Sequence, residues 1–177
     1  MRLFYAVAAD EGVKAAASAA IGRLGSAARG ARWVEPRDLH LTLRYLGETP
    51  SSRLPELESL MRRAARESAP FEIVYGGVGA FESLEDPRVI WIGLDAGLGP
   101  MERLAGLLGY DEPRPYAPHL TLGRRRREPP SAAFQAALRA EPSLALRQAV
   151  DRISLYASRP APSGRVYEVL SEAPLGG

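Results

Sequence analysis

Hydrophobic and polar positions alternate in some segments of the chain and follow helical spacing in others. Alternating or β-branched and aromatic runs predict strands at residues 2–8, 39–47, 71–79, 88–95, 118–125, 150–157 and 165–170. Apolar residues at helical spacing predict helices at 11–29, 53–67, 99–109 and 131–140. The order is therefore β-α-β-α-β, followed by β-α-β-α-β with one extra strand, and Asp10 is the expected N-cap of the first helix.

One tetrapeptide occurs twice. HLTL stands at 40–43 and again at 119–122, and each copy has EPR a few residues before it. The repetition predicts one domain, residues 1–177, made of two pseudo-repeats at about 1–85 and 86–177. We expect two lobes that face each other across a pseudo-twofold cleft, with one motif on each wall.

Strand alternation puts the polar members of each tetrapeptide on one face. His40 and Thr42 share a face, His119 and Thr121 do the same, and the leucines of both motifs pack behind them. Both histidines of the chain carry this pattern. A relic of duplication without chemical function is the alternative interpretation, but two imidazoles and two hydroxyls that converge on one volume suit catalysis better.

The composition narrows the chemistry. The chain has 177 residues, 46% hydrophobic and 25% charged, as a soluble globular protein does. It has no cysteine, which excludes thiolate metal sites and cysteine nucleophiles, and two histidines, which excludes a three-histidine metal site. No segment approaches the roughly 20 apolar residues that cross a bilayer, so no membrane partner and a cytoplasmic location are expected.

The charge balance is mild. Basic residues number 23 and acidic residues 21, so the overall field does not drive tight nucleic-acid binding. Lys14 is the only lysine, and all other basic residues are arginine, whose planar fork suits phosphate oxygens. Genomic base composition explains the same arginine content equally well.

Two histidines without a metal suit proton transfer. A neutral imidazole accepts a proton while an imidazolium donates one, and both forms are available near pH 7. Hydroxyls between the two rings can bind the oxygens of an anion. This combination fits in-line displacement at phosphorus, with neither a metal nor a cofactor expected.

The motifs resemble a known family. HLTLRYLGE at 40–48 and PYAPHLTLGR at 115–124 are similar to the paired motifs of the two-histidine (2H) phosphoesterases. Within that family the chain resembles the RNA 2',3'-cyclic phosphodiesterases, also called 2'-5' RNA ligases, over nearly its whole length. The resemblance implies a bilobal α+β fold with antiparallel sheets lining a central cleft and helices outside.

The same resemblance implies an activity and a partner. The expected reaction is metal-independent hydrolysis of an RNA 2',3'-cyclic phosphate to a 2'-phosphomonoester, with 2'-5' RNA joining as its reverse. The expected partner is RNA with 2',3'-cyclic phosphate or 2'-phosphate ends, tRNA fragments among them, bound by a monomer. The alternatives are an RNA-end binding or joining protein whose hydrolysis is incidental, and a phosphodiesterase of a small cyclic or 2'-5' nucleotide.

Catalytic and phosphate-binding roles carry over onto five residues. His119 is assigned as the base that activates water and His40 as the acid on the 3'-oxygen, although the sequence does not separate these roles. Thr42 and Thr121 are expected to bind the phosphate. Arg124 matches the arginine that closes the family's second motif, but strand alternation turns it away from His119 unless a bulge at Gly123 re-aims it.

Four further residues are substrate-binding candidates. Arg44 is expected on the face of His40. Tyr45 can stack on a base, but its alternation opposite His40 favours core packing. Tyr116 suits the cleft and the core equally. Arg126 belongs to the run 124–127, which is either a track for the RNA backbone or a charged edge strand.

Overall fold

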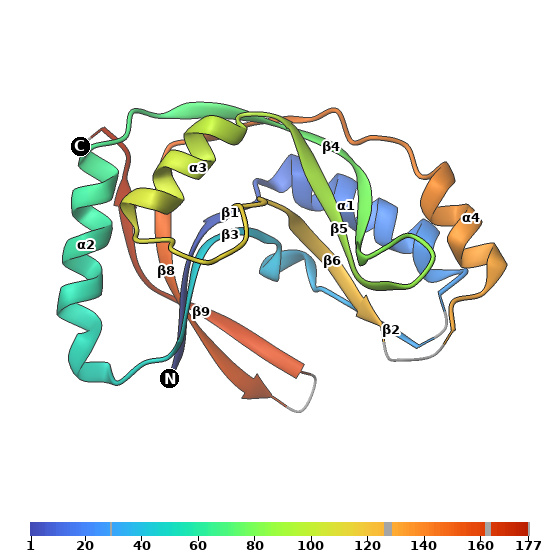
Figure 1. The fold of residues 1–177 in the computed structure, drawn as a ribbon, viewed down its shortest axis with the longest axis horizontal. Helices are drawn as coiled ribbons and strands as arrows, with labels where there is room; N and C mark the ends of the chain where they lie inside the picture. The colour runs from blue at the N-terminus through green and yellow to red at the C-terminus, as the bar shows by residue number, and fades with distance from the viewer. Residues whose placement is uncertain (29, 126–128, 162–163, 177) are drawn as a thin grey trace.

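The computed structural model describes residues 1–28, 30–125, 129–161 and 164–176 (Figure 1). The α-helices are α1 (Glu11–Gly25), α2 (Leu54–Arg66), α3 (Leu98–Leu107) and α4 (Ala132–Ala140). The strands are β1 (Arg2–Ala8), β2 (Ala31–Trp33), β3 (His40–Glu48), β4 (Phe71–Glu82), β5 (Pro87–Ala96), β6 (Leu120–Arg125), β7 (Arg147–Val150), β8 (Arg152–Ala161) and β9 (Gly164–Pro174). Short 3-10 helices precede β3 and α2, at Pro36–Asp38 and Ser51–Arg53.

All the strands belong to one antiparallel sheet in the order β7-β4-β5-β6-β3-β1-β8-β9, and β2 adds to β6. The centre of this order is the β6–β3 pair. Exchanging β1 with β5, β3 with β6 and β4 with β8 reproduces the central six strands in reverse. Two repeats that donate their last strand to each other would produce this order. The expected boundary near residue 85 falls in the hairpin between β4 and β5.

The helices lie outside the curved sheet, and the expected α+β fold class is confirmed (Figure 1). Helix α2 packs on β8 and β9, α3 on β3, α4 on β4, and α1 on β2 and α4. Asp10 caps α1 as predicted, because its carboxylate accepts a hydrogen bond from the Val13 amide at 2.8 Å. None of the helices in the described part of the chain is long and apolar enough to span a membrane.

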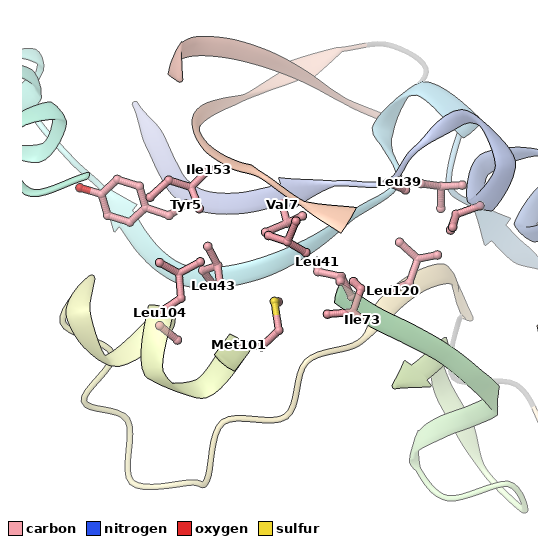
Figure 2. Packing of buried hydrophobic residues seen from close by; sticks show 14 of the residues in the cluster. Tyr5, Val7, Leu39, Leu41, Leu43, Ile73, Met101, Leu104, Leu120 and Ile153 are labelled. Atoms are coloured by element: carbon pink, nitrogen blue, oxygen red, sulfur yellow. The ribbon is translucent and has the colours of Figure 1, made fainter. Parts of the chain in front are cut away.

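The motif leucines form the centre of the hydrophobic core. Leu41, Leu43, Leu120 and Leu122 are all fully buried, which confirms that they pack behind the histidines. Figure 2 shows Met101 and Leu104 of α3 against the leucines of β3, and Ile73 beside Leu120. Burial of these side chains fixes the opposite face of β3 and β6.

The structure differs from the predicted elements mainly in their lengths. The strands β2 and β7 have three and four residues, too few for a readable pattern, and were not predicted. The predicted helix 11–29 ends earlier, at Gly25, because the Ser26 hydroxyl bonds the Arg23 carbonyl and the chain turns toward β2. The strands β4 and β9 run several residues further than their hydrophobic patterns, since hairpin pairing continues beyond the core.

Leu120→Ala is expected to lower the free energy of unfolding by about 2–5 kcal/mol, because it leaves a cavity where the two motif strands meet. Leu98→Ala is the matched control, since Leu98 is 49% exposed at the start of α3. It should change the free energy by no more than about 0.5 kcal/mol. Urea denaturation measures both, and equal losses would contradict the central role of Leu120.

Candidate active site

The two motifs meet at one backbone pair. Strands β3 and β6 run antiparallel with Leu41 opposite Leu120. In that register the flanking residues come together crosswise, so His40 lies next to Thr121 and Thr42 next to His119. All four side chains line one cavity of about 410 Å³. The structure therefore gathers the four motif residues from both parts of the chain.

Each motif strand is interrupted immediately after its threonine. The β1–β3 register pairs Ala6 with Thr42 and then Tyr5 with Arg44, which leaves Leu43 as an extra residue. The β5–β6 register leaves Leu122 as an extra residue in the same way, between Thr121 and Gly123. The two bulges occupy the same position in the two motifs.

A bulge reverses the alternation of the residues that follow it. The fifth residue after each histidine, Tyr45 in one motif and Arg124 in the other, consequently lines the cavity. Simple alternation would turn Arg124 away from the cavity, but a bulge does re-aim it, with Leu122 and not Gly123 as the extra residue. The core prediction for Tyr45 is wrong: its side chain is 54% exposed on the cavity wall.

Arg44 is turned the other way by the same bulge. The expectation that it shares the face of His40 is therefore wrong, and its guanidinium Nη1 donates to the Leu108 carbonyl at 2.7 Å, at the end of α3. Its counterpart in the second motif is Gly123. A Cβ there would lie 2.6 Å from the Trp33 ring, so β2 can approach β6 only beside a glycine.

Tyr116 stands behind the cavity. Its hydroxyl donates to the Thr42 carbonyl at 2.9 Å, and burial raises its pKa well above the usual value. Of the two predicted positions for Tyr116, the cleft and the core, the structure shows packing against the core. From there its hydrogen bond holds the first motif strand. Arg126 lies outside the described residues. The neighbouring Arg125 packs over the Phe134 ring of α4, 5.3 Å from the ring centre.

Both imidazoles are oriented by the backbone in the same way. Nδ1 of His40 contacts the Asp38 carbonyl oxygen at 2.6 Å, and Nδ1 of His119 contacts the Ala117 carbonyl oxygen at 2.7 Å. A carbonyl oxygen only accepts, so Nδ1 carries the proton in each ring. Nε2 is then the nitrogen left to accept or donate a proton in the cavity.

Aromatic rings enclose each imidazole. Phe4 and Tyr167 lie 4.9 and 5.2 Å from the His40 ring, centre to centre, and Phe81 lies 5.0 Å from the His119 ring with its plane almost perpendicular. Sequence reasoning missed these rings. They come from strands distant in the chain, and only alternation on an already known sheet would have placed them.

This enclosure disfavours the charged form of both histidines. Burial, together with the smaller effects of the charges of His119 and Arg124, lowers the pKa of His40 from about 6.5 to about 4, against the opposing hydrogen bond to Asp38. Burial also lowers the pKa of His119, with Arg124 adding to the effect. Both rings are therefore neutral at pH 7 while the cavity is empty.

One carboxyl group shares the cavity. Asp38 lines it, and burial raises the pKa of its carboxyl above the ordinary value. In the described part of the chain, no three His, Cys, Asp or Glu side chains are grouped so that they could hold a metal ion.

Comparison with known proteins identifies the family of this chain. Residues 7–91 match the family model described as LigT like Phosphoesterase. The RNA 2',3'-cyclic phosphodiesterase of Thermotoga maritima is 32% identical over 183 positions, covering 100% of this chain and 97% of the relative. The chain belongs to the LigT-like phosphoesterase family. The Thermus thermophilus RNA 2',3'-cyclic phosphodiesterase is 37% identical, over 100% of this chain and 91% of its own.

Solved structures extend the likeness of this LigT-like phosphoesterase to the whole fold. A crystal structure of a Thermus thermophilus protein has a TM-score of 0.85 and 35% identity, covering 100% of this chain and 99% of the other. Escherichia coli LigT, crystallised with 3'-AMP, has a TM-score of 0.77 and 26% identity, covering 99% and 98%. The resemblance seen in the paired motifs is confirmed.

The lowered pKa of His40 predicts an acid-sensitive fold. Between pH 6.5 and 4, His40 binds a proton in the unfolded chain but not in the folded protein. The free energy of unfolding therefore falls as the pH falls through this window. His40→Gln should remove this part of the pH dependence, about 3 kcal/mol at pH 4.

Urea denaturation of the wild type and of His40→Gln at pH 7, 5.5 and 4 measures the difference. Comparing the two proteins cancels the carboxyl groups that titrate in the same range. Identical pH dependence in both would show that His40 keeps an ordinary pKa in the fold.

Proposed function

We propose that this chain hydrolyses RNA 2',3'-cyclic phosphates to 2'-phosphomonoesters by acid–base catalysis with His40 and His119. The observation that carries the proposal is the crosswise arrangement of two imidazoles and two threonines in one cavity. The family and the names of the relatives support the same substrate class.

The reaction needs two proton transfers at opposite sides of phosphorus. One imidazole Nε2 takes a proton from water as its oxygen bonds to phosphorus, and the other Nε2 gives a proton to the departing 3'-oxygen as the P–O3' bond breaks. The phosphate stays on the 2'-oxygen. The same two groups in the same roles would join a cyclic-phosphate end to a 5'-hydroxyl, which takes the place of water, so that the 5'-oxygen bonds to phosphorus as the P–O3' bond breaks and a 2'-5' bond results.

The remaining cavity groups stabilise the charge that develops on the phosphate oxygens. The hydroxyls of Thr42 and Thr121 line the same cavity as the rings and can donate to the non-bridging oxygens, and the guanidinium of Arg124 adds a fixed positive charge. The charge of Arg124 lowers the pKa of both imidazoles, and His119 lowers that of His40 as well. An anionic phosphodiester between them raises both histidine pKa values. Binding of the substrate therefore favours the protonated imidazole that donates a proton to the leaving oxygen.

His40→Ala and His119→Ala should each reduce turnover of a cyclic-phosphate RNA at least about 10²-fold in excess chelator, because each removes one proton transfer. Product analysis of the wild type should give a 2'-phosphate. Gln135→Ala is the control for protein preparation and folding, because Gln135 is on α4 and does not line the cavity. This variant should turn over the substrate at the wild-type rate. Either histidine variant within tenfold of the wild-type rate would rule out the paired scheme.

The assignment of His119 as base and His40 as acid has a separate test. In a substrate whose bridging 3' atom is sulfur, that sulfur leaves as a thiolate. A thiolate leaving group does not need a proton donor. On this substrate His40→Ala should recover most of the lost rate, whereas His119→Ala should not. Recovery by His119→Ala instead would reverse the two roles while leaving the reaction itself intact.

A further inference from the structure

Arginines form a second row beyond His40 on the sheet face that lines the cavity. Strand β1 pairs with β8 so that Phe4 lies opposite Tyr156 and Arg2 opposite Ser158. The first of these pairs touches His40, since the Phe4 ring lies 4.9 Å and the Tyr156 ring 5.9 Å from the imidazole. The second pair is the next step outward on the same face.

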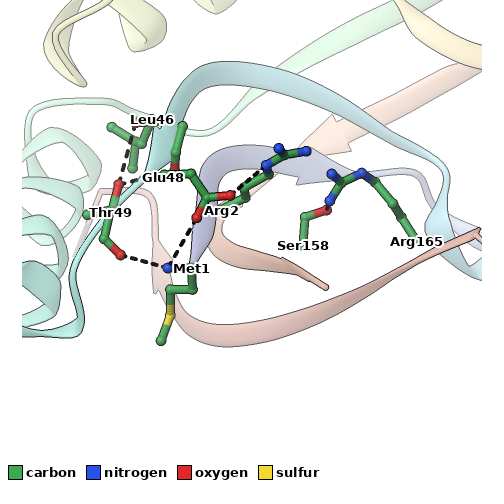
Figure 3. Close-up of polar contacts among 8 residues, drawn as sticks. Met1, Arg2, Leu46, Glu48, Thr49, Ser158 and Arg165 are labelled. Atoms are coloured by element: carbon green, nitrogen blue, oxygen red, sulfur yellow. Dashed lines mark hydrogen bonds and ion pairs between the residues drawn. The ribbon is translucent and has the colours of Figure 1, made fainter. Parts of the chain in front are cut away.

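Arg165 of β9 joins this outer row. Its Nη1 donates to the Ser158 hydroxyl at 2.8 Å, which places its guanidinium over the strand that pairs with Arg2 (Figure 3). Arg2, Ser158 and Arg165 line the cavity that contains His40, and also an adjoining cavity of about 320 Å³. The outer row is therefore an end of the active-site cavity and not a separate surface.

The outer row has unused capacity for an anion. Nε of Arg2 bonds Glu48 Oε1 at 2.7 Å, which fixes the guanidinium (Figure 3). Arg165 bonds only a neutral hydroxyl, and no carboxylate in the described part of the chain lies within ion-pair distance of it. The guanidinium groups of Arg2 and Arg165 and the carboxylate of Glu48 together leave a net positive charge at this end of the cavity.

The outer row lies one step along β1 beyond the residues that contact His40. Arg2 is two residues, about 7 Å, from Phe4, whose ring contacts His40, and the side chains of Arg2 and Arg165 line the cavity that contains His40. A 2',3'-cyclic phosphate ends its chain, so its only neighbouring phosphate is the one on the 5'-oxygen of the same nucleoside. When the cyclic phosphate lies between the histidines, that second phosphate lies one nucleoside away.

We propose that Arg2 and Arg165 form a second phosphate subsite, which binds the 5'-phosphate of the terminal nucleoside and so favours RNA ends over nucleoside cyclic phosphates. This inference rests on the proposed cyclic phosphodiesterase function. It makes the two arginines specificity-determining residues that contact the substrate at a distance from the reacting phosphorus. Their contribution is binding energy that a substrate without the 5'-phosphate cannot use.

Three substrates separate the contribution of the 5'-phosphate from that of the rest of the substrate. They are a nucleoside 2',3'-cyclic phosphate, the same nucleoside 2',3'-cyclic phosphate with an added 5'-phosphate, and a dinucleotide with a 2',3'-cyclic end. The 5'-phosphate alone should raise kcat/KM by about tenfold or more, and the dinucleotide should match it. Arg165→Gln should remove about tenfold from the two phosphate-bearing substrates and change the nucleoside cyclic phosphate by less than twofold. Arg2→Gln should act in the same direction.

Arg152→Gln is the matched control, because Arg152 is on β8, the strand between those of Arg2 and Arg165, but pairs with Asp151 and lines neither cavity. It should leave all three substrates unchanged. Loss of rate by Arg165→Gln on all three substrates alike, or no preference of the wild type for a 5'-phosphate, would overturn the subsite. Failure of the wild type to turn over any of the three would refute the proposed function instead.

Discussion

The pairing of Leu41 with Leu120 is the constraint on which the proposed active site depends. It joins the two motif strands, and the side chains on its core side are fully buried. A slip of one residue would turn those leucines into the cavity and the imidazoles into the core. The hydrophobic free energy of the core thus sets the geometry of polar groups that make no contribution to it themselves.

Desolvation is the second element of the site. Aromatic rings around each imidazole hold both histidines neutral in the empty cavity, and their Nδ1 atoms are committed to backbone carbonyls. Neither imidazole is therefore protonated at Nε2 before an anion binds. In the proposed mechanism such a site responds to the charge of its ligand as well as to its shape, because an anion favours the protonated imidazole that the proposed reaction requires.

The sequence was sufficient to predict the four motif residues, because alternation and repetition are local properties. It was not sufficient for the residues that follow them. Arg44 and Tyr45 exchange faces because Leu43 is an extra residue opposite β1, and a bulge depends on the pairing partner as much as on the bulged strand. The aromatic rings around His40 were missed for a similar reason, since Phe4 and Tyr167 are brought together by pairings between opposite ends of the chain.

The exchanged position of the outer strands has a consequence for synthesis of the chain. Strand β1 has β3 on one side and β8 on the other, and β8 begins only at Arg152. During translation the first strand therefore keeps an unpaired edge until the residues of β8 have left the ribosome. The part of the sheet that contains β3, β1 and β8 is therefore completed late, and its assembly depends on contacts of long sequence separation.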